Sequence, residues 1–367
     1  MKRTPILALS LGLCLLGAAC AAPPPARTPE PVIPAKEEIM EMSLTGEGKP
    51  VIYLAGGCFW GLEKLMQSIP GVVEAVSGYA NGSGEEDASY DRVSSGQTGF
   101  RETVRVEYDP QQVSLDALLL AYFYVIDPSQ VNRQGNDVGS QYQTGVYFED
   151  RETWATVERI AALEAGRSQG FAVELAPLIN FFPAEEYHQD YLDKNPEGYC
   201  HIPAEEIRLF SQLRIDPGQY RRPARELIPD LLEEEQFRVT QENGTEQPFT
   251  NEFWDFQGRG LYVDVVTGEP LFSSLDKFDS SCGWPSFSAP IEAPVLIEKA
   301  DDSLGLQRTE VRSRAGDSHL GHVFRGDRES PNGVRYCINS AALRFVAYED
   351  MEAEGYGYLK EIFEQEK

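Results

Sequence analysis

Apolar and polar positions alternate in two different ways along the first half of the chain. Residues 51–55 form a short apolar run that ends at Gly56 and Gly57, and residues 58–69 then repeat apolar side chains at helical spacing. Further strands are predicted at 103–108, 146–149 and 172–175, and helices at 115–125 and 153–165. Strands and helices that take turns in this way are typical of an α/β domain.

The pattern changes after residue 205. Residues 205–235 are rich in proline and charge, which fits a linker or a wrapping segment. Beyond them, short strand-like runs at 260–266, 295–299 and 306–312 lie between turn residues, so we expect a β-rich module with few helices. A length of 367 residues fits two domains. The predicted class is α+β, with a first domain at 48–210, a linker at 211–224, a second domain at 225–351 and a C-terminal tail at 352–367.

The amino terminus predicts export. Lys2 and Arg3 precede an apolar run at residues 6–16, which is shorter than the roughly 20 residues that span a bilayer. Gly17-Ala18-Ala19 before Cys20 resembles a bacterial lipoprotein cleavage box. We therefore expect a signal peptide at 1–19, a lipid on Cys20 that anchors the protein to a membrane, and a location in the cell envelope. Simple secretion, after cleavage next to a neighbouring alanine, is the alternative.

Composition narrows the possible functions. Residues 20–47 are rich in Pro, Ala and Glu and predict an extended stalk. The chain has 59 acidic and 32 basic residues and a formal charge of -27, which disfavours nucleic acid as a partner. Motifs for dinucleotides, P-loop phosphates and the hydrolase nucleophile elbow are absent from the sequence. The cysteines are therefore the first candidates for chemistry.

Four cysteines lie beyond the signal peptide, namely Cys58, Cys200, Cys282 and Cys337. In an exported protein the ordinary expectation is two structural disulfides. Cys58, however, opens a predicted helix, where free backbone N–H groups and the helix dipole lower the pKa of a thiol. Cys200 and Cys282 lie in segments rich in Gly and Pro, which suit a loop that carries a second thiol. Reactive thiols and structural disulfides are both open at this point.

The segment around Cys58 resembles a known family. Residues 57–61 (Gly-Cys-Phe-Trp-Gly) match the signature of the A-type peptide methionine sulfoxide reductases, MsrA. Other matching segments follow in order at 78–82, 90–102, 134–142 and 195–200. The resemblance implies an α/β sandwich with a mixed sheet and flanking helices. It also implies that Cys58 is the nucleophile, Glu102 the proton donor and Cys200 the thiol that resolves the oxidised Cys58.

The same resemblance assigns substrate-binding residues. Tyr90 and Tyr142 would bind the sulfoxide oxygen, and Phe59 and Trp60 would hold the methyl group. Asp137 would brace this network, although Asn136 and Asp137 could instead only stabilise a turn. Phe100 stands where many relatives have His, and His188 is expected to be structural.

The second half resembles the B-type reductases, MsrB, at residues 281–287, 319–324 and 335–343. The resemblance implies that Cys337 is the nucleophile and Cys282 the resolving thiol. Trp284, His319, His322 and Asn339 would bind the substrate or help to protonate its oxygen. Many MsrB domains bind zinc through two pairs of cysteines, but this chain has Asp264, Thr267, Ser313 and Gly316 there. Without thiolates at these positions we expect no metal, and we expect no other cofactor.

The predicted function is the reduction of methionine sulfoxide in oxidised proteins by two domains. By family, the first domain acts on the S-epimer and the second on the R-epimer. Each nucleophile would become a sulfenic acid and then an intradomain disulfide. Thioredoxin or a similar exported dithiol would restore the thiols. The alternatives are a binding lipoprotein held by two disulfides and another thiol enzyme, such as a peroxidase or a disulfide isomerase.

Overall fold

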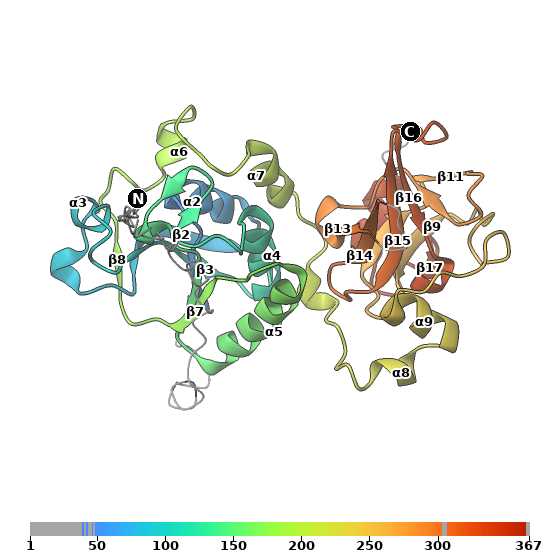
Figure 1. The fold of residues 1–367 in the computed structure, drawn as a ribbon, viewed down its shortest axis with the longest axis horizontal. Helices are drawn as coiled ribbons and strands as arrows, with labels where there is room; N and C mark the ends of the chain where they lie inside the picture. Colours follow the sequence, from blue (N-terminus) through green and yellow to red (C-terminus); the bar gives the residue numbers. More distant parts are fainter. Residues whose placement is uncertain (1–38, 40–41, 43–45, 47, 303–306, 365–367) are drawn as a thin grey trace, which may run out of the picture.

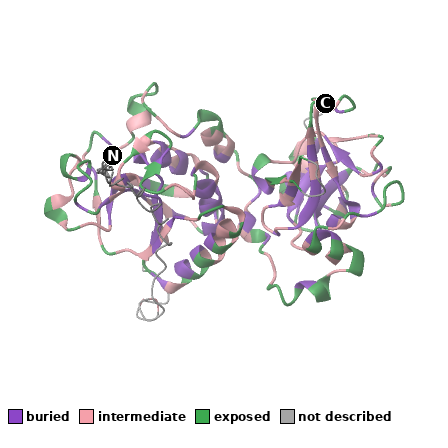
Figure 2. Ribbon diagram, in the orientation of Figure 1, coloured by how far each residue is buried: buried purple, intermediate pink, exposed green. Residues whose placement is uncertain are grey.

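The computed structural model describes residues 39, 42, 46, 48–302 and 307–364. They form two domains, each with a buried hydrophobic core (Figure 1, Figure 2). The last fully buried residue of the first core is Phe210, and the first of the second core is Ile215. The predicted two-domain α+β class is confirmed. The predicted signal peptide and Cys20 lie outside the described residues.

The first domain contains a six-stranded mixed sheet in the order β7-β6-β1-β3-β2-β8. Only the β6–β7 pair is parallel. Alternate residues of β1 face opposite sides of the sheet, so Leu54 joins the main core and Tyr53 a smaller cluster on the other face. The strands are β1 (Val51–Ala55), β2 (Val72–Ala80), β3 (Arg101–Tyr108), β6 (Gly145–Phe148), β7 (Glu174–Pro177) and β8 (Phe181–Pro183), with a separate pair β4 (Arg133–Gln134) and β5 (Asp137–Val138).

Helices pack against this sheet, as the α/β pattern predicts. Ser114 caps the first long helix by accepting a hydrogen bond from the Ala117 amide, and Asp150 caps the second through Thr153. The predicted helix at 115–125 is confirmed, and the one at 153–165 is two residues longer at each end. The helices are α2 (Phe59–Ser68), α3 (Tyr90–Val93), α4 (Leu115–Val125), α5 (Arg151–Arg167), α6 (Tyr191–Lys194) and α7 (Ala204–Ser211), with short 3-10 segments η1 (Glu85–Asp87) and η2 (Ser140–Tyr142).

The second domain is built from two antiparallel sheets, in the orders β10-β9-β17 and β11-β12-β16-β15-β14-β13. Phe272 and Phe287 stack between them in the core. The strands are β9 (Gly260–Asp264), β10 (Pro270–Ser273), β11 (Lys277–Phe278), β12 (Ser286–Phe287), β13 (Leu296–Asp301), β14 (Arg308–Ser313), β15 (His319–Arg325), β16 (Val334–Ile338) and β17 (Leu343–Ala347), with 3-10 segments η4 (Ala293–Val295) and η6 (Ser340–Ala342).

Two segments differ from the sequence-based expectation. The linker region contains α7, η3 (Pro217–Gln219), α8 (Ile228–Leu231) and α9 (Glu234–Glu242), so it is more helical than its prolines suggested. The expected tail beyond residue 351 packs onto the second domain, because Leu359 and Phe363 in η7 (Gly357–Phe363) are buried in its core. Among the helices of the described residues, none has the length and apolar character of a membrane span.

Candidate active sites

Cys58 lies at the first turn of α2, as the sequence predicts. It is the N-cap residue of this helix and only 7% of it is exposed. Gly57 before it has a φ of +87°, and a Cβ at this position would lie 2.6 Å from the Cβ of Gln134. A glycine is therefore required to bring the chain from β1 into the helix at this point. The turn places the thiol inside the domain and not at its surface.

The expected lowering of the Cys58 pKa is wrong for the unliganded protein. Burial raises its pKa, and the nearby Glu102 carboxyl adds to the effect when it is ionised. A hydrogen bond from the Trp60 amide acts in the opposite direction but is the weaker influence. Desolvation thus outweighs the helix N-terminus, and Cys58 is a protonated thiol at neutral pH.

Glu102 on β3 is the carboxyl group of this site. It is 2% exposed, and its Oε2 accepts a hydrogen bond of 3.2 Å from the Phe59 amide at the start of α2. Burial raises the pKa of Glu102 to about 8. At neutral pH this carboxyl is therefore mostly protonated, which is the state in which it can donate a proton.

Tyr90 on α3 and Tyr142 at the end of η2 belong to the same site. Burial raises the pKa of both hydroxyls, and both are also influenced electrostatically by Glu102 and Cys58. Asp137 on β5 accepts a hydrogen bond of 3.0 Å from the hydroxyl of Tyr199, next to Cys200. Asp137 therefore has a partner within the site and does more than stabilise its own turn.

Phe59 and Trp60 form the aromatic part of the site. Phe59 is fully buried, and Trp60 stacks on Tyr191 with ring centroids 3.7 Å apart. The Nε1 of Trp60 donates a hydrogen bond of 3.1 Å to Nδ1 of His188. His188 also lies 4.7 Å from the ring of Tyr90, so this histidine supports the site more directly than its sequence context suggested.

Two positions around this site, one acidic and one aromatic, were not expected or not explained from sequence. Glu185 accepts hydrogen bonds of 2.9 Å from the Tyr79 hydroxyl and from the Tyr90 amide, which fixes the start of α3. Phe100 is buried and packs edge-on against Tyr79 and Phe182. Phe100 thus adds hydrocarbon beneath the site where many relatives have a titratable ring.

Cys200 lies against the same helical turn as Cys58. A Cβ at Gly61 would lie 2.9 Å from the sulfur of Cys200, so the absence of a side chain at Gly61 makes room for this thiol. The thiol donates a hydrogen bond of 3.1 Å to the Ile202 carbonyl, and burial raises its pKa. The first turn of α2 therefore brings together the two cysteines that the sequence paired.

In the second domain, Cys337 and Cys282 lie side by side. Cys337 is on β16, between Ser286 of β12 and His322 of β15 in the strand register. Cys282 is on the turn before β12, and its sulfur lies 3.3 Å from that of Cys337. A rigid strand thus holds one thiol and a turn holds the other.

The two sulfur atoms share a proton. Hydrogen bonds from Cys337 and from the hydroxyls of Ser280 and Ser286 lower the pKa of Cys282 to about 4 despite its burial. The same contact raises the pKa of Cys337, while Arg335 favours its thiolate. The two thiols therefore titrate as a coupled pair, in which a thiolate on one sulfur is stabilised by the proton that the other sulfur keeps.

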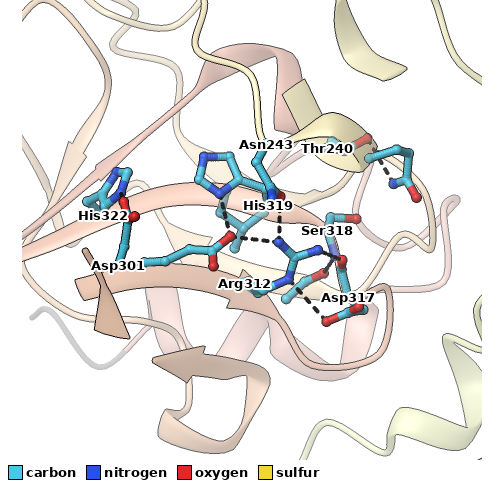
Figure 3. Close-up of polar contacts among 12 residues, drawn as sticks. Thr240, Asn243, Asp301, Arg312, Asp317, Ser318, His319 and His322 are labelled. Carbon is cyan, nitrogen blue, oxygen red and sulfur yellow. Dashed lines mark hydrogen bonds and ion pairs between the residues drawn. The ribbon is translucent and has the colours of Figure 1, made fainter. Parts of the chain in front are cut away.

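His319 and His322 each pair with a carboxylate. Nδ1 of His319 lies 2.7 Å from Oε1 of Glu310, and Nε2 of His322 lies 2.7 Å from Oδ2 of Asp301 (Figure 3). Because His322 is opposite Cys337 in the β15–β16 register, the two side chains share one face of the sheet. These carboxylates orient the two rings next to the thiol pair.

Trp284 and Asn339 are the other two predicted substrate-binding residues of the second domain. The Trp284 indole donates a hydrogen bond of 3.3 Å to the Glu246 carbonyl, and the Asn339 side chain bonds both the Glu246 amide and the Leu320 carbonyl. Glu246 was not predicted, because no local pattern marks it. Arg335 was also missed, although it stands two positions before Cys337 on the same strand and therefore points to the same face.

The positions of the missing zinc cysteines meet in space. Oδ1 of Asp264 accepts hydrogen bonds from the amides of Val266 and Thr267, and the Ser313 hydroxyl and Asp264 both lie within 3 Å of where a Cβ at Gly316 would be. Among the described residues, no three His, Cys, Asp or Glu side chains are grouped so as to hold a metal ion.

Each half of the chain matches the model of a known protein family. Residues 50–214 match the model described as peptide methionine sulfoxide reductase, and residues 232–347 match the SelR domain. The chain belongs to the methionine sulfoxide reductases. The two matches together cover more than half of its length, and they agree with the two domains of the structure.

Solved structures of methionine sulfoxide reductases are similar to the first domain. Reduced Mxr1 from Saccharomyces cerevisiae is 35% identical, with 44% of this chain and 93% of that chain covered and a TM-score of 0.38. Methionine sulfoxide reductase A of Corynebacterium diphtheriae is 34% identical, with 48% and 93% covered and the same TM-score of 0.38. Mxr1 solved in complex with Trx2 is 25% identical, with 41% and 90% covered and a TM-score of 0.27.

Proposed function

We propose that the first domain reduces the S-epimer of methionine sulfoxide and the second the R-epimer, each with its own pair of cysteines. Two mirror-related arrangements of oxygen and methyl group cannot be presented equally to a thiol and a proton donor in one rigid pocket. The observation that carries this proposal is that each domain combines two cysteines with groups able to donate a proton: Glu102 with its raised pKa in one, and two carboxylate-paired histidines in the other.

In the first domain, the sulfur of Cys58 attacks the sulfoxide sulfur while Glu102 protonates the oxygen. Transfer of that oxygen leaves the thioether of methionine and a sulfenic acid on Cys58. The raised pKa of Cys58 means that its proton must leave as the substrate binds, and the Glu102 carboxylate that has given its own proton to the oxygen accepts it, so the net proton transfer is from the thiol to the oxygen. Tyr90 and Tyr142 donate hydrogen bonds to that oxygen, Phe59 and Trp60 surround the methyl group, and Asp137 braces the network.

In the second domain, Cys337 is the nucleophile and Cys282 the resolving thiol. Cys337 is fixed on a central strand opposite His322, whereas Cys282 lies on a turn, which suits a thiol that must move to form a bond. The thiolate of Cys282 can take the proton of Cys337 across 3.3 Å as Cys337 attacks. One of the two histidines, His319 or His322, gives a single proton to the oxygen, which ends as the hydroxyl of the sulfenic acid on Cys337, and Trp284 and Asn339 shape the pocket.

Recycling follows the same chemistry in both domains. The resolving thiol attacks the sulfenic acid sulfur, the S–O bond breaks, and one water molecule and one intradomain disulfide form. Two electrons and two protons are then needed to restore the thiols, and a dithiol protein of the thioredoxin class supplies them by disulfide exchange. Multiple turnover without any thiol reductant would contradict this part of the proposal.

The test uses separate epimers of a blocked methionine sulfoxide with the Cys58→Ser and Cys337→Ser variants. We expect Cys58→Ser to lose S-epimer reduction only and Cys337→Ser to lose R-epimer reduction only. Loss of the same epimer in both variants would contradict the assignment. Faster turnover of hydrogen peroxide than of either sulfoxide would instead favour a peroxidase. A wild-type protein that reduces neither sulfoxide, together with unfolding of the first domain in Cys58→Ser, would favour a binding lipoprotein held by disulfides.

We also propose that the protein is exported and anchored in the cell envelope by a lipid on Cys20. The support is the short apolar run after Lys2 and Arg3, followed by small residues before Cys20. Labelled fatty acid should be incorporated into the wild-type chain but not into Cys20→Ser. Equal incorporation by both would rule out this residue as the lipid attachment site, and release of unlabelled wild-type protein into the medium would indicate simple secretion.

A further inference from the structure

A cavity rich in arginine lies where the two domains meet. Its volume is about 30 Å³, and its lining includes α5 of the first domain, the linker and the turn after β14. Three of the lining arginines, one from each of these segments, have buried Nε–H groups that find no hydrogen-bond partner among the described residues. They are Arg167, Arg222 and Arg314. Three unpaired donors on three segments around one cavity are a feature that neither active site explains.

The cavity also carries an excess of positive charge. Five arginines line it, but only two carboxylates do. Each carboxylate is already shared: Asp116 contacts Arg159 and Arg221, and one oxygen of Glu164 binds both Arg167 and Arg314 at 2.7 and 2.9 Å. The positive charges around this cavity are therefore only partly balanced by the protein.

Asp317 lies beside the cavity and balances part of this positive charge. It bonds Arg312 at 3.1 Å (Figure 3), and it lies 3.7 Å from Arg167 and 3.8 Å from Arg222. Burial lowers the pKa of both Arg222 and Arg314, and in each case a neighbouring arginine, Arg312 or Arg167, lowers it further. Such a concentration of guanidinium groups is unexpected in a chain with a formal charge of -27.

We propose that this cavity, lined by Arg167, Arg222 and Arg314, is a binding site for a small inorganic oxyanion, and that the bound anion joins the two domains. Guanidinium groups match oxyanions because their N–H groups donate to several oxygens at once. A tetrahedral anion offers acceptors in different directions, as donors from three separate segments require. The small volume of the cavity favours a free ion such as phosphate over a larger ligand.

The test measures binding of inorganic phosphate to the full chain by equilibrium dialysis, at constant ionic strength. We expect one phosphate per chain for the wild type, and at least about tenfold weaker binding for Arg222→Gln. Arg225→Gln is the matched control, because this substitution removes the same charge from the same segment. Arg225 is exposed and does not line the cavity. Arg225→Gln should bind phosphate as the wild type does.

Three results would overturn the proposal: no saturable phosphate binding by the wild type, equal weakening by both variants, or equally tight binding of chloride. Binding must also raise the unfolding temperature of the wild type and of Arg225→Gln more than that of Arg222→Gln. Arg167→Lys is a second variant at another wall of the cavity, and it keeps the charge but removes the Nε donor. Wild-type affinity in both Arg222→Gln and Arg167→Lys would likewise reject the site.

Discussion

The sulfur atoms of Cys282 and Cys337 lie 3.3 Å apart in the reduced second domain. A disulfide requires about 2.05 Å, so a small movement of the turn that carries Cys282 closes the bond. We predict that one equivalent of R-epimer sulfoxide produces a Cys282–Cys337 disulfide, detected as a loss of two hydrogens in the tryptic peptides. With Cys282→Ser, a sulfenic acid on Cys337 should accumulate and react with dimedone. An unmodified Cys337 in that variant would contradict the assigned order.

The pH dependence of the first domain should follow Glu102. Its pKa is raised to about 8, so the proton-donating form predominates below this value and is lost above it. S-epimer reduction should therefore fall as the pH rises through about 8. Glu102→Gln cannot donate this proton, and we expect a loss of roughly 10²- to 10⁴-fold, the usual contribution of a general acid. The R-epimer activity of the same variant provides the internal control, and a parallel loss there would point to misfolding.

Gly61→Ala should separate the two halves of the first domain's cycle. The added Cβ would lie 2.9 Å from the sulfur of Cys200, which must then move away. We expect the first turnover of S-epimer sulfoxide to proceed while steady-state turnover slows, with a trappable sulfenic acid on Cys58. Gly166→Ala is the control, because Gly166 is also on a helix and has open space around its Cβ position. Slow chemistry in the first turnover would contradict this prediction.

Asp264 should stabilise the second domain although it takes no part in the reaction. It is fully buried and accepts hydrogen bonds from the amides of Val266 and Thr267. Asp264→Ala leaves these donors unpaired, and we expect a loss of about 1–3 kcal/mol in the free energy of unfolding. Urea unfolding of the variant measures it, with the exposed Asp230→Ala as the control. A change below about 0.5 kcal/mol would show that the turn does not depend on this carboxyl.

Local sequence patterns were sufficient to predict many of the helices and strands. The helix at 115–125 was predictable because its residues 117–125 are all apolar or aromatic and Ser114 precedes the helix as a cap. The segment at 72–80 was not predicted as a strand, because it includes Glu, Ser and Gly, and only its pairing with β3 and β8 makes it a strand. Sequence similarity, and not periodicity, supplied the residues of both candidate sites.

Some features depend on contacts between segments far apart in the chain, and local sequence patterns could not predict them. The pKa of Cys58 depends on burial beneath distant segments and on Glu102 from β3, so the position at a helix start alone predicted the wrong direction. The support of the Trp60 indole by His188 likewise joins segments 128 residues apart. The packing of Leu359 and Phe363 into the second core could not be distinguished from a free tail, because the segment is short and rich in charge.

The burial of Cys58 has a consequence for an enzyme whose substrate is formed by oxidants. Peroxides react with thiolates far more readily than with thiols, and further oxidation to sulfinic or sulfonic acid ends activity. A thiol that stays protonated until methionine sulfoxide arrives is a poor target for such reagents. The thiol of the first domain therefore resists oxidation by peroxides while the site is empty, and it becomes reactive when methionine sulfoxide binds.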